Sequence, residues 1–241
     1  MKLHIDVLTL FPELFPGPLA GSITGRAMNR GLLEIDPVNL RDFSHDERGT
    51  VDDKPYGGGP GMLMKVEPLF EATDFLKTRS PGAKVVLTTP RGRLFSQKLA
   101  RELAKEERLI VVCGHYEGVD QRYIDSRVDY EVSIGDYVLT NGNLPAMVMI
   151  DAIARLLPGA LGCDESSEDE SHTGWLLEYP QYTRPEEYEG LKVPEILLSG
   201  DHGKIAAWRR LEAERLTMRR RPELYARHRA WPSGTEDINK D

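Results

Sequence analysis

Short apolar runs alternate with segments of helical periodicity through the first 162 residues of this 241-residue chain. Runs rich in Val and Ile and bounded by turn residues predict strands at Leu3–Phe11, Leu32–Leu40, Lys84–Thr89, Leu109–Cys113 and Tyr130–Ile134. Apolar residues at helical spacing predict helices at Glu67–Phe75, Ser96–Glu107, Asp120–Arg127 and Pro145–Leu157. This alternation favours an α/β fold, in which helices cover both faces of a mainly parallel sheet.

The alternating pattern stops near Gly159, and a polar, acidic run follows. Such a composition is typical of a solvated linker, which we place at residues 161–173. Residues 174–241 are predicted to be mostly helical, with Trp208, Leu211 and Met218 on one side of a helix over Lys204–Arg221. We therefore expect an α/β domain at 1–160 and a small helical domain at 174–241.

Charge is distributed unevenly along the chain. The formal net charge of −8 counts, taken alone, against a nucleic-acid partner. However, residues 163–200 hold ten carboxylates against two basic side chains, whereas residues 204–229 hold nine basic side chains against three acidic ones. The acidity belongs mostly to one stretch, and the basic segment is either a phosphate-binding surface or a solvated helix face.

The number of cysteines and the lengths of the apolar runs indicate the cellular compartment of the protein. Cys113 and Cys163 are the only cysteines, too few for a disulfide framework and not spaced for zinc. The first residues alternate between polar and apolar side chains, as in a half-buried strand rather than a signal peptide. No apolar run approaches the roughly 18 residues of a membrane span. We expect a cytoplasmic protein without a membrane segment.

Three predicted strands end in glycine-containing loops, at Thr88–Gly92, Gly114–Gly118 and Ser133–Gly142. Ligands of doubly wound α/β folds bind at the carboxyl ends of the strands, and glycine lets the backbone approach them closely. The sequence lacks the Walker phosphate loop, the Rossmann glycine fingerprint and the hydrolase nucleophile elbow. A nucleotide-like ligand would therefore be held without the usual phosphate cradle, which suits a cofactor that has no phosphate.

A fourth glycine cluster lies in Thr50–Met62, where Gly57, Gly58 and Gly59 stand between two prolines. Such a loop is either a surface turn or a place where a partner can approach the backbone. Asp52 and Asp53 could bind a guanine edge or a metal ion, or simply be solvated.

Other stretches of the chain, together with these loops, carry a family resemblance. They are Phe11-Pro12, Gly25-Arg26-Ala27, Arg41–Asp46, Val51–Met62, Cys113–Asp120, Ser133–Leu139, Leu144-Pro145-Ala146, Tyr182–Pro185 and Leu197–Gly200. In this order, and over nearly the whole chain, they resemble the bacterial tRNA (guanine-37-N1)-methyltransferase family of the SPOUT superfamily.

The resemblance implies methyl transfer from S-adenosyl-L-methionine to N1 of the guanine just 3′ of the anticodon. It also implies a deep trefoil knot and a homodimer with the site between two subunits. The basic helix and Arg219–Pro222 would grip the anticodon stem of the tRNA. The cofactor-binding residues that it implies are Leu87, Thr88, Thr89, Pro90, Gly114, Tyr116, Glu117, Gly118, Ser133, Ile134, Gly135, Asp136, Tyr137, Val138, Leu139, Gly142 and Pro145.

Guanine N1 carries a proton, so its methylation needs a general base and a group that stabilises the charge developing on the ring. Arg155 matches the family's arginine at this step. Counting without gaps from Gly162 puts Glu170 at the position of the family's catalytic Asp, whereas a one-residue slip restores Asp169. Glu117 is either a carboxylate near the cofactor, or at the Mg²⁺ of a metal-assisted reaction, or a turn residue that faces solvent.

Two other functions remain as alternatives. One is a methyltransferase for another RNA or base, against which the whole-chain match weighs, especially Tyr182–Pro185. The other is a non-catalytic RNA-binding protein that kept the fold. The complete cofactor loops and Arg155 weigh against this second alternative.

Overall fold

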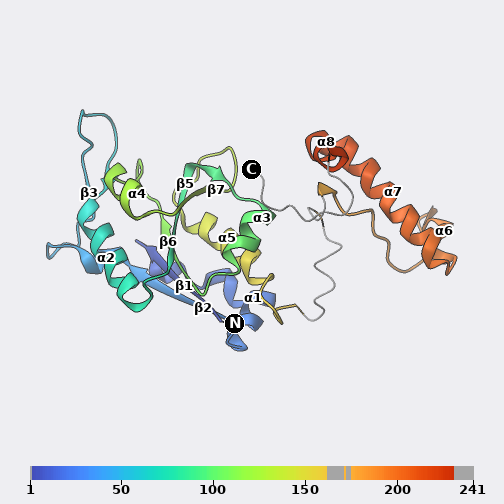
Figure 1. The fold of residues 1–241 in the computed structure, drawn as a ribbon, viewed down its shortest axis with the longest axis horizontal. Coiled ribbons are helices and arrows are strands. Elements are labelled where there is room, and N and C mark those ends of the chain that lie inside the picture. The colour runs from blue at the N-terminus through green and yellow to red at the C-terminus, as the bar shows by residue number, and fades with distance from the viewer. Residues whose placement is uncertain (1, 162–170, 172–174, 231–241) are drawn as a thin grey trace. The chain divides into compact units, whose positions relative to one another are not determined.

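The computed structural model describes residues 2–161, 171 and 175–230 (Figure 1). Cys163 and both candidate bases, Asp169 and Glu170, lie outside the described residues, as does most of the expected linker. The chain divides into two compact units, Met1–Cys163 and Asp164–Asp241. The separate roles expected of the two domains stay predictions. In the described part of the chain, no helix is long and apolar enough to cross a membrane.

The first unit is built on a five-stranded sheet in which every strand pair is parallel, with the order β2-β1-β6-β5-β7. The strands are β1 (Leu3–Thr9), β2 (Leu33–Asn39), β5 (Lys84–Leu94), β6 (Arg108–Cys113) and β7 (Tyr130–Ser133). Each one falls where the apolar runs predict it. Only β5 runs well past its predicted end, because its register against β7 shifts between Thr88 and Arg93 and pairing then resumes.

Side chains along the strands alternate between two hydrophobic cores. On β6, Leu109, Val111 and Cys113 enter one core, whereas Ile110 and Val112 enter the other. The first core also holds side chains of α3 (Gln97–Leu103) and α5 (Asn143–Ala154). The second holds those of α2 (Val66–Arg79) and α4 (Gln121–Arg127). Helices therefore cover both faces and the predicted α/β fold is confirmed, while the trefoil knot stays a prediction.

Two helices of this unit, α3 and α4, begin at polar residues whose side chains cap them. Leu99 N donates to the Ser96 hydroxyl at 3.3 Å at the start of α3, and Arg122 N donates to Asp120 Oδ1 at 2.9 Å at the start of α4. One short helix, α1 (Ser22–Asn29), was not expected, because glycine at its centre disfavours a helix. Gly25 is needed there, since a Cβ would lie 2.0 Å from the Ala20 carbonyl oxygen.

The remaining short elements connect this framework. Three 3₁₀ turns lie at Pro12–Leu14, Gly17–Ala20 and Leu40–Phe43, and the two-residue strands β3 (Asp52–Asp53) and β4 (Leu63–Met64) pair antiparallel. The last pair closes the base of the glycine-rich loop, so this loop is anchored at both ends.

The second unit contains a small hairpin and three helices. They are β8 (Glu187–Tyr188), β9 (Leu191–Lys192), α6 (Glu195–Leu198), α7 (His202–Arg220) and α8 (Pro222–Ala230). The expected helix over Lys204–Arg221 is present as α7. Its start is capped by Asp201, whose side chain accepts a hydrogen bond from Lys204 N at 3.1 Å.

The apolar residues expected on one side of this helix are not the ones that the structure buries. Leu211 is 44% exposed and Met218 is 54% exposed, whereas the buried side chains are Ala213 and Thr217. Small residues are buried here because an extended segment packs directly on the helix: Leu177 N donates to the Thr217 hydroxyl at 2.8 Å.

Candidate active site

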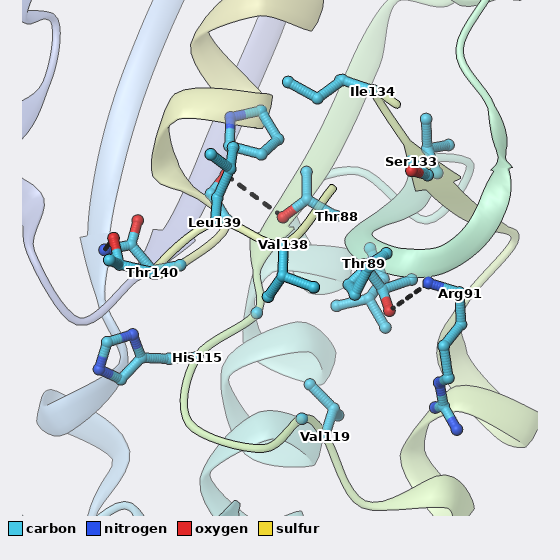
Figure 2. A pocket seen from close by; sticks show the side chains of 18 of the residues that line it. Thr88, Thr89, Arg91, His115, Val119, Ser133, Ile134, Val138, Leu139 and Thr140 are labelled. Atoms are coloured by element: carbon cyan, nitrogen blue, oxygen red, sulfur yellow. Dashed lines mark hydrogen bonds between the residues drawn. The ribbon is translucent and has the colours of Figure 1, made fainter. Parts of the chain in front are cut away.

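The three segments predicted to form a ligand site surround one cavity of about 260 Å³, beside the middle of β5 and the carboxyl ends of β6 and β7 (Figure 2). The loop predicted at Thr88–Gly92 is wrong, because these residues continue β5, whose register against β7 shifts between Thr88 and Arg93. Every residue that the family resemblance assigns to the cofactor lines this cavity except Asp136, which is exposed between the lining residues Gly135 and Tyr137. The structure thus brings together residues that are up to 58 positions apart, between Leu87 and Pro145.

The three loops meet at Thr88, Gly114 and Gly142. Gly142 N donates to the Gly114 carbonyl oxygen at 2.7 Å, and the Thr88 hydroxyl has the carbonyl oxygens of Val112 and Gly142 at 3.2 and 3.3 Å as acceptors. A Cβ at position 142 would lie 2.0 Å from Thr88 Oγ1. Glycine is therefore required at Gly142 for close approach of the loops.

Some lining residues were not among the candidates. Arg91, His115, Thr140 and Asn141 belong to the predicted loops, so the glycines that mark those loops also mark their neighbours. Val119, Ile124 and Val132 add apolar wall from other segments. No sequence signal separates such a residue from an ordinary core side chain.

His115 stands against two aromatic rings at the edge of this cavity. Its ring meets Phe11 edge-on at 5.4 Å between centroids and Tyr116 at 4.4 Å. Burial and the nearby positive charge of Arg41 lower the pKa of His115, against the opposing effect of Asp52. Its Nδ1 is buried and has no hydrogen-bond partner among the described residues. The neutral imidazole therefore has an unused polar atom beside the cavity.

Tyr116 adopts a left-handed backbone conformation, with φ of 57°. Burial raises the pKa of the Tyr116 hydroxyl, and the charge of Asp52 and a hydrogen bond with Asp52 raise it further, while Arg41 lowers it. A non-glycine residue in this region is uncommon, and such strain is concentrated at functional sites. Asp52 thus faces the loop after β6.

The glycine-rich loop is docked on the same part of the site. Glu117 N donates to the Met62 carbonyl oxygen at 3.0 Å, and Met64 N donates to the Gly118 carbonyl oxygen at 2.9 Å. Tyr56, in the middle of this loop, is 99% exposed. The base of this loop therefore belongs to the wall of the site, whereas the part that holds Tyr56 is open to a partner.

One group of residues within the described ranges has the spacing of metal ligands: His4, Asp6 and Asp36 on β1 and β2. Arg108 already occupies this group, because its Nε donates to Asp6 Oδ2 at 2.8 Å and its Nη2 lies 2.8 Å from His4 Nε2. The cluster acts as a structural hydrogen-bond network and not as a ligand site.

Arg155 lies away from the cavity of its own chain. It caps the C-terminal end of α5 and is half-buried, whereas Gly142 and Pro145, at the other end of this helix, line the cavity. Twelve helical residues at 1.5 Å each span about 18 Å. The structure therefore does not bring Arg155 to the cavity within one protomer.

Comparisons with known proteins agree in the family that they indicate. A family model described as "tRNA (Guanine-1)-methyltransferase TrmD" matches residues 3–227. The tRNA (guanine-N(1)-)-methyltransferase of Desulforamulus reducens is 54% identical over 224 residues, which cover 92% of this chain and 88% of the relative. That of Geobacter sulfurreducens is 55% identical over 222 residues, with coverages of 92% and 91%.

An α/β sheet with a cavity at its strand ends, together with matches of this extent, defines the class of protein as a tRNA methyltransferase. Within that class, the chain belongs to the TrmD family of tRNA (guanine-N1)-methyltransferases. Membership of this family favours methylation of tRNA guanine over methylation of another RNA or base, and over RNA binding without catalysis.

Proposed function

We propose that the protein transfers the methyl group of S-adenosylmethionine to N1 of guanine 37 of tRNA, with the cofactor in the cavity beside β5 and the ends of β6 and β7. The observation that carries this proposal is that the three glycine-containing loops close around one cavity. The family supplies the reaction, tRNA guanine methylation at N1, which requires a methyl donor.

The residues of the cavity fit this donor. Leu87, Val138 and Leu139 provide apolar walls for an adenine ring and a methionine side chain, and the close-packed backbone at Gly114 and Gly142 offers carbonyl and amide groups. When bound, the cofactor supplies a methyl group activated by its sulfonium.

The protein's own groups then have to move one proton and stabilise one charge. A carboxylate, Glu170 or Asp169, accepts the proton from guanine N1, which makes the nitrogen nucleophilic. The Arg155 guanidinium stabilises the negative charge that develops on O6, or holds the carboxylate in place. No covalent intermediate with the protein is required.

A homodimer accounts for the position of Arg155. Leu144 and Val148 share a face of α5 with Arg155 at helical spacing and are 58% and 50% exposed, and Val138 of the cavity loop is 83% exposed. A two-fold interface through this face would pack each α5 against its symmetry mate. The C-terminal end of one α5, with Arg155, would then approach the cavity of the partner subunit.

Among the described residues that line the cavity, Glu117 is the one carboxylate. This position supports a role at the cofactor over that of a turn residue facing solvent. A carboxylate oxygen is a ligand that Mg²⁺ prefers, so an ion needed by the reaction would be held here.

One assay tests the reaction and its position. The protein is incubated with labelled S-adenosylmethionine and tRNA transcripts that carry either guanine or adenine at position 37, and the modified base is located by mass spectrometry. We expect 1-methylguanine at position 37 of the first transcript and none in the second. Label at another guanine, or at another ring nitrogen, would overturn the proposal.

A further inference from the structure

A second cavity lies within the unit Asp164–Asp241, with a volume of about 530 Å³. Its walls come from the extended segment 179–186, from the end of α6 and from the first turns of α7. Nothing in the chemistry of methyl transfer described above uses this cavity.

The segment that forms one wall is held along α7 and α8. Four contacts fix residues 175–182 antiparallel to α7 and α8. Arg227 lies 5.0 Å from the Trp175 ring, and Leu177 N donates to Thr217 Oγ1 at 2.8 Å. Nearer the start of α7, Arg209 lies 4.9 Å from the Tyr179 ring, and the Tyr182 and Trp208 ring centroids are 6.5 Å apart. This wall is therefore formed by the fold of the unit itself, before any ligand arrives.

The cavity has an apolar floor and a cationic rim. Leu197 and Ile205 are half-buried in the floor, while Tyr182, Arg184 and Arg209 are exposed at the rim. Apolar and aromatic surface takes the face of a ring, and guanidinium groups take phosphate oxygens. The combination fits a nucleotide better than it fits an apolar ligand or a bare anion.

Neither arginine at the rim is held in an ion pair, although the Arg209 guanidinium contacts the Tyr179 ring. Within the described ranges, neither Arg184 nor Arg209 has a carboxylate within 4.0 Å, whereas the neighbouring Lys204, Arg210 and Arg215 are paired with Asp201, Glu214 and Glu212 at 3.0, 3.3 and 2.7 Å. The two guanidinium groups at the rim are therefore not held in ion pairs, and Glu186, also exposed in the lining, adds one negative charge beside them.

We propose that this cavity binds one unpaired nucleotide of the tRNA substrate. Its base packs against Tyr182 and the apolar floor, and its phosphate is bound by Arg184 and Arg209. The proposal rests on the proposed function for the presence of an RNA substrate. The basic charge of this segment alone predicts only nonspecific contacts with the phosphate backbone, whereas the cavity provides a site for one nucleotide.

The test compares substitutions in the full-length protein. Tyr182→Ala removes the ring and is expected to weaken tRNA binding about 5- to 140-fold, whereas Tyr182→Phe keeps the ring and should stay within about two-fold of the original. Arg184→Ala removes an exposed side chain, so the fold is preserved. It should lower the slope of log Kd against log salt by about 0.7, and Arg184→Lys should restore most of that slope.

The matched control is Arg210→Ala, which removes a neighbouring arginine that is paired with Glu214. It should change tRNA affinity much less than Arg184→Ala. S-adenosylmethionine binding should be unchanged in all variants, because none of them touches the first cavity. A direct readout comes from photo-crosslinking of tRNA that carries 4-thiouridine at single unpaired positions, which should label the segment 179–186.

The proposal is overturned if Tyr182→Ala and Arg184→Ala bind tRNA as the original protein does. It is equally overturned if these variants change the oligomeric state and leave RNA affinity intact, since the cavity would then belong to a protein contact. Neither result touches the proposed function, which fails only if the original protein does not methylate guanine 37.

Discussion

A methyl group at Gly142 would collide with two other loops of the first cavity, because its Cβ would lie 2.0 Å from Thr88 Oγ1 and 2.6 Å from Gly114 N. We expect Gly142→Ala to weaken S-adenosylmethionine binding at least tenfold in calorimetry. It should also lower the free energy of unfolding by about 1–3 kcal/mol, the usual cost of overpacking. Gly82→Ala is the matched control, since a Cβ there meets nothing within 4 Å. Equal behaviour of the two variants would contradict the close packing.

The general base gives a second prediction at the residue scale. A carboxylate displaced by about 1 Å costs on the order of 100-fold in rate, so Glu170 and Asp169 cannot both serve equally well. Of Glu170→Ala and Asp169→Ala, we expect one to be nearly inactive and the other to keep substantial activity in single-turnover methylation. Wild-type rates in both would remove these residues from the reaction.

Individual site residues were predictable where a family motif or a glycine marks a loop. Thr88, Gly114 and Gly142 were found this way, and the structure brings them together. The contribution of Val132 to the cavity wall was not predictable, because a valine that lines a cavity at a strand end has the same sequence surroundings as a valine in the core. The unpartnered Nδ1 of His115 depends on how three segments pack, which no local pattern encodes.

At the scale of elements, strands were predicted closely and helical faces less well. The Val and Ile runs of β1 and β6, buried on both sides, have few alternatives to a central parallel strand. The edge strands β2 and β7 also begin and end near their expected bounds. On α7, by contrast, an extended segment selects Ala213 and Thr217 as the buried residues in place of the larger Leu211 and Met218. Burial there is decided by a distant segment and not by hydrophobicity.

The contact between α2 and α4 provides a test at this scale. Thr73 and Tyr123 are fully buried, and their hydroxyl oxygens lie 2.7 Å apart in a hydrogen bond. Tyr123→Phe or Thr73→Val leaves one buried hydroxyl without this partner and should cost about 1–3 kcal/mol in urea unfolding. The double variant should cost less than the sum of the two single ones. Strict additivity would mean that the hydrogen bond contributes nothing to the packing of α2 on α4.

For the whole molecule, the distance between Arg155 and the cavity makes subunit exchange informative. In the proposed homodimer, Arg155→Ala and Gly142→Ala would inactivate opposite halves of a site shared between two subunits. When both chains are co-expressed in equal amounts, half of the random dimers are mixed, and each mixed dimer has one intact site. Activity should therefore return to about a quarter of the original. If each site is built from a single chain, the mixture will stay inactive.

The Thr88 hydroxyl and the Gly142–Gly114 hydrogen bond link the middle of β5, the segment after β6 and the loop after β7 at one point. Loops joined in this way cannot open one at a time, because loosening any of them breaks a bond that the others share. Amide hydrogens near Thr88 on β5 and at the ends of β6 and β7 should accordingly exchange with solvent at a common rate. A ligand that touches only one loop would slow exchange in all three, so the site would respond to its ligand as one cooperative body.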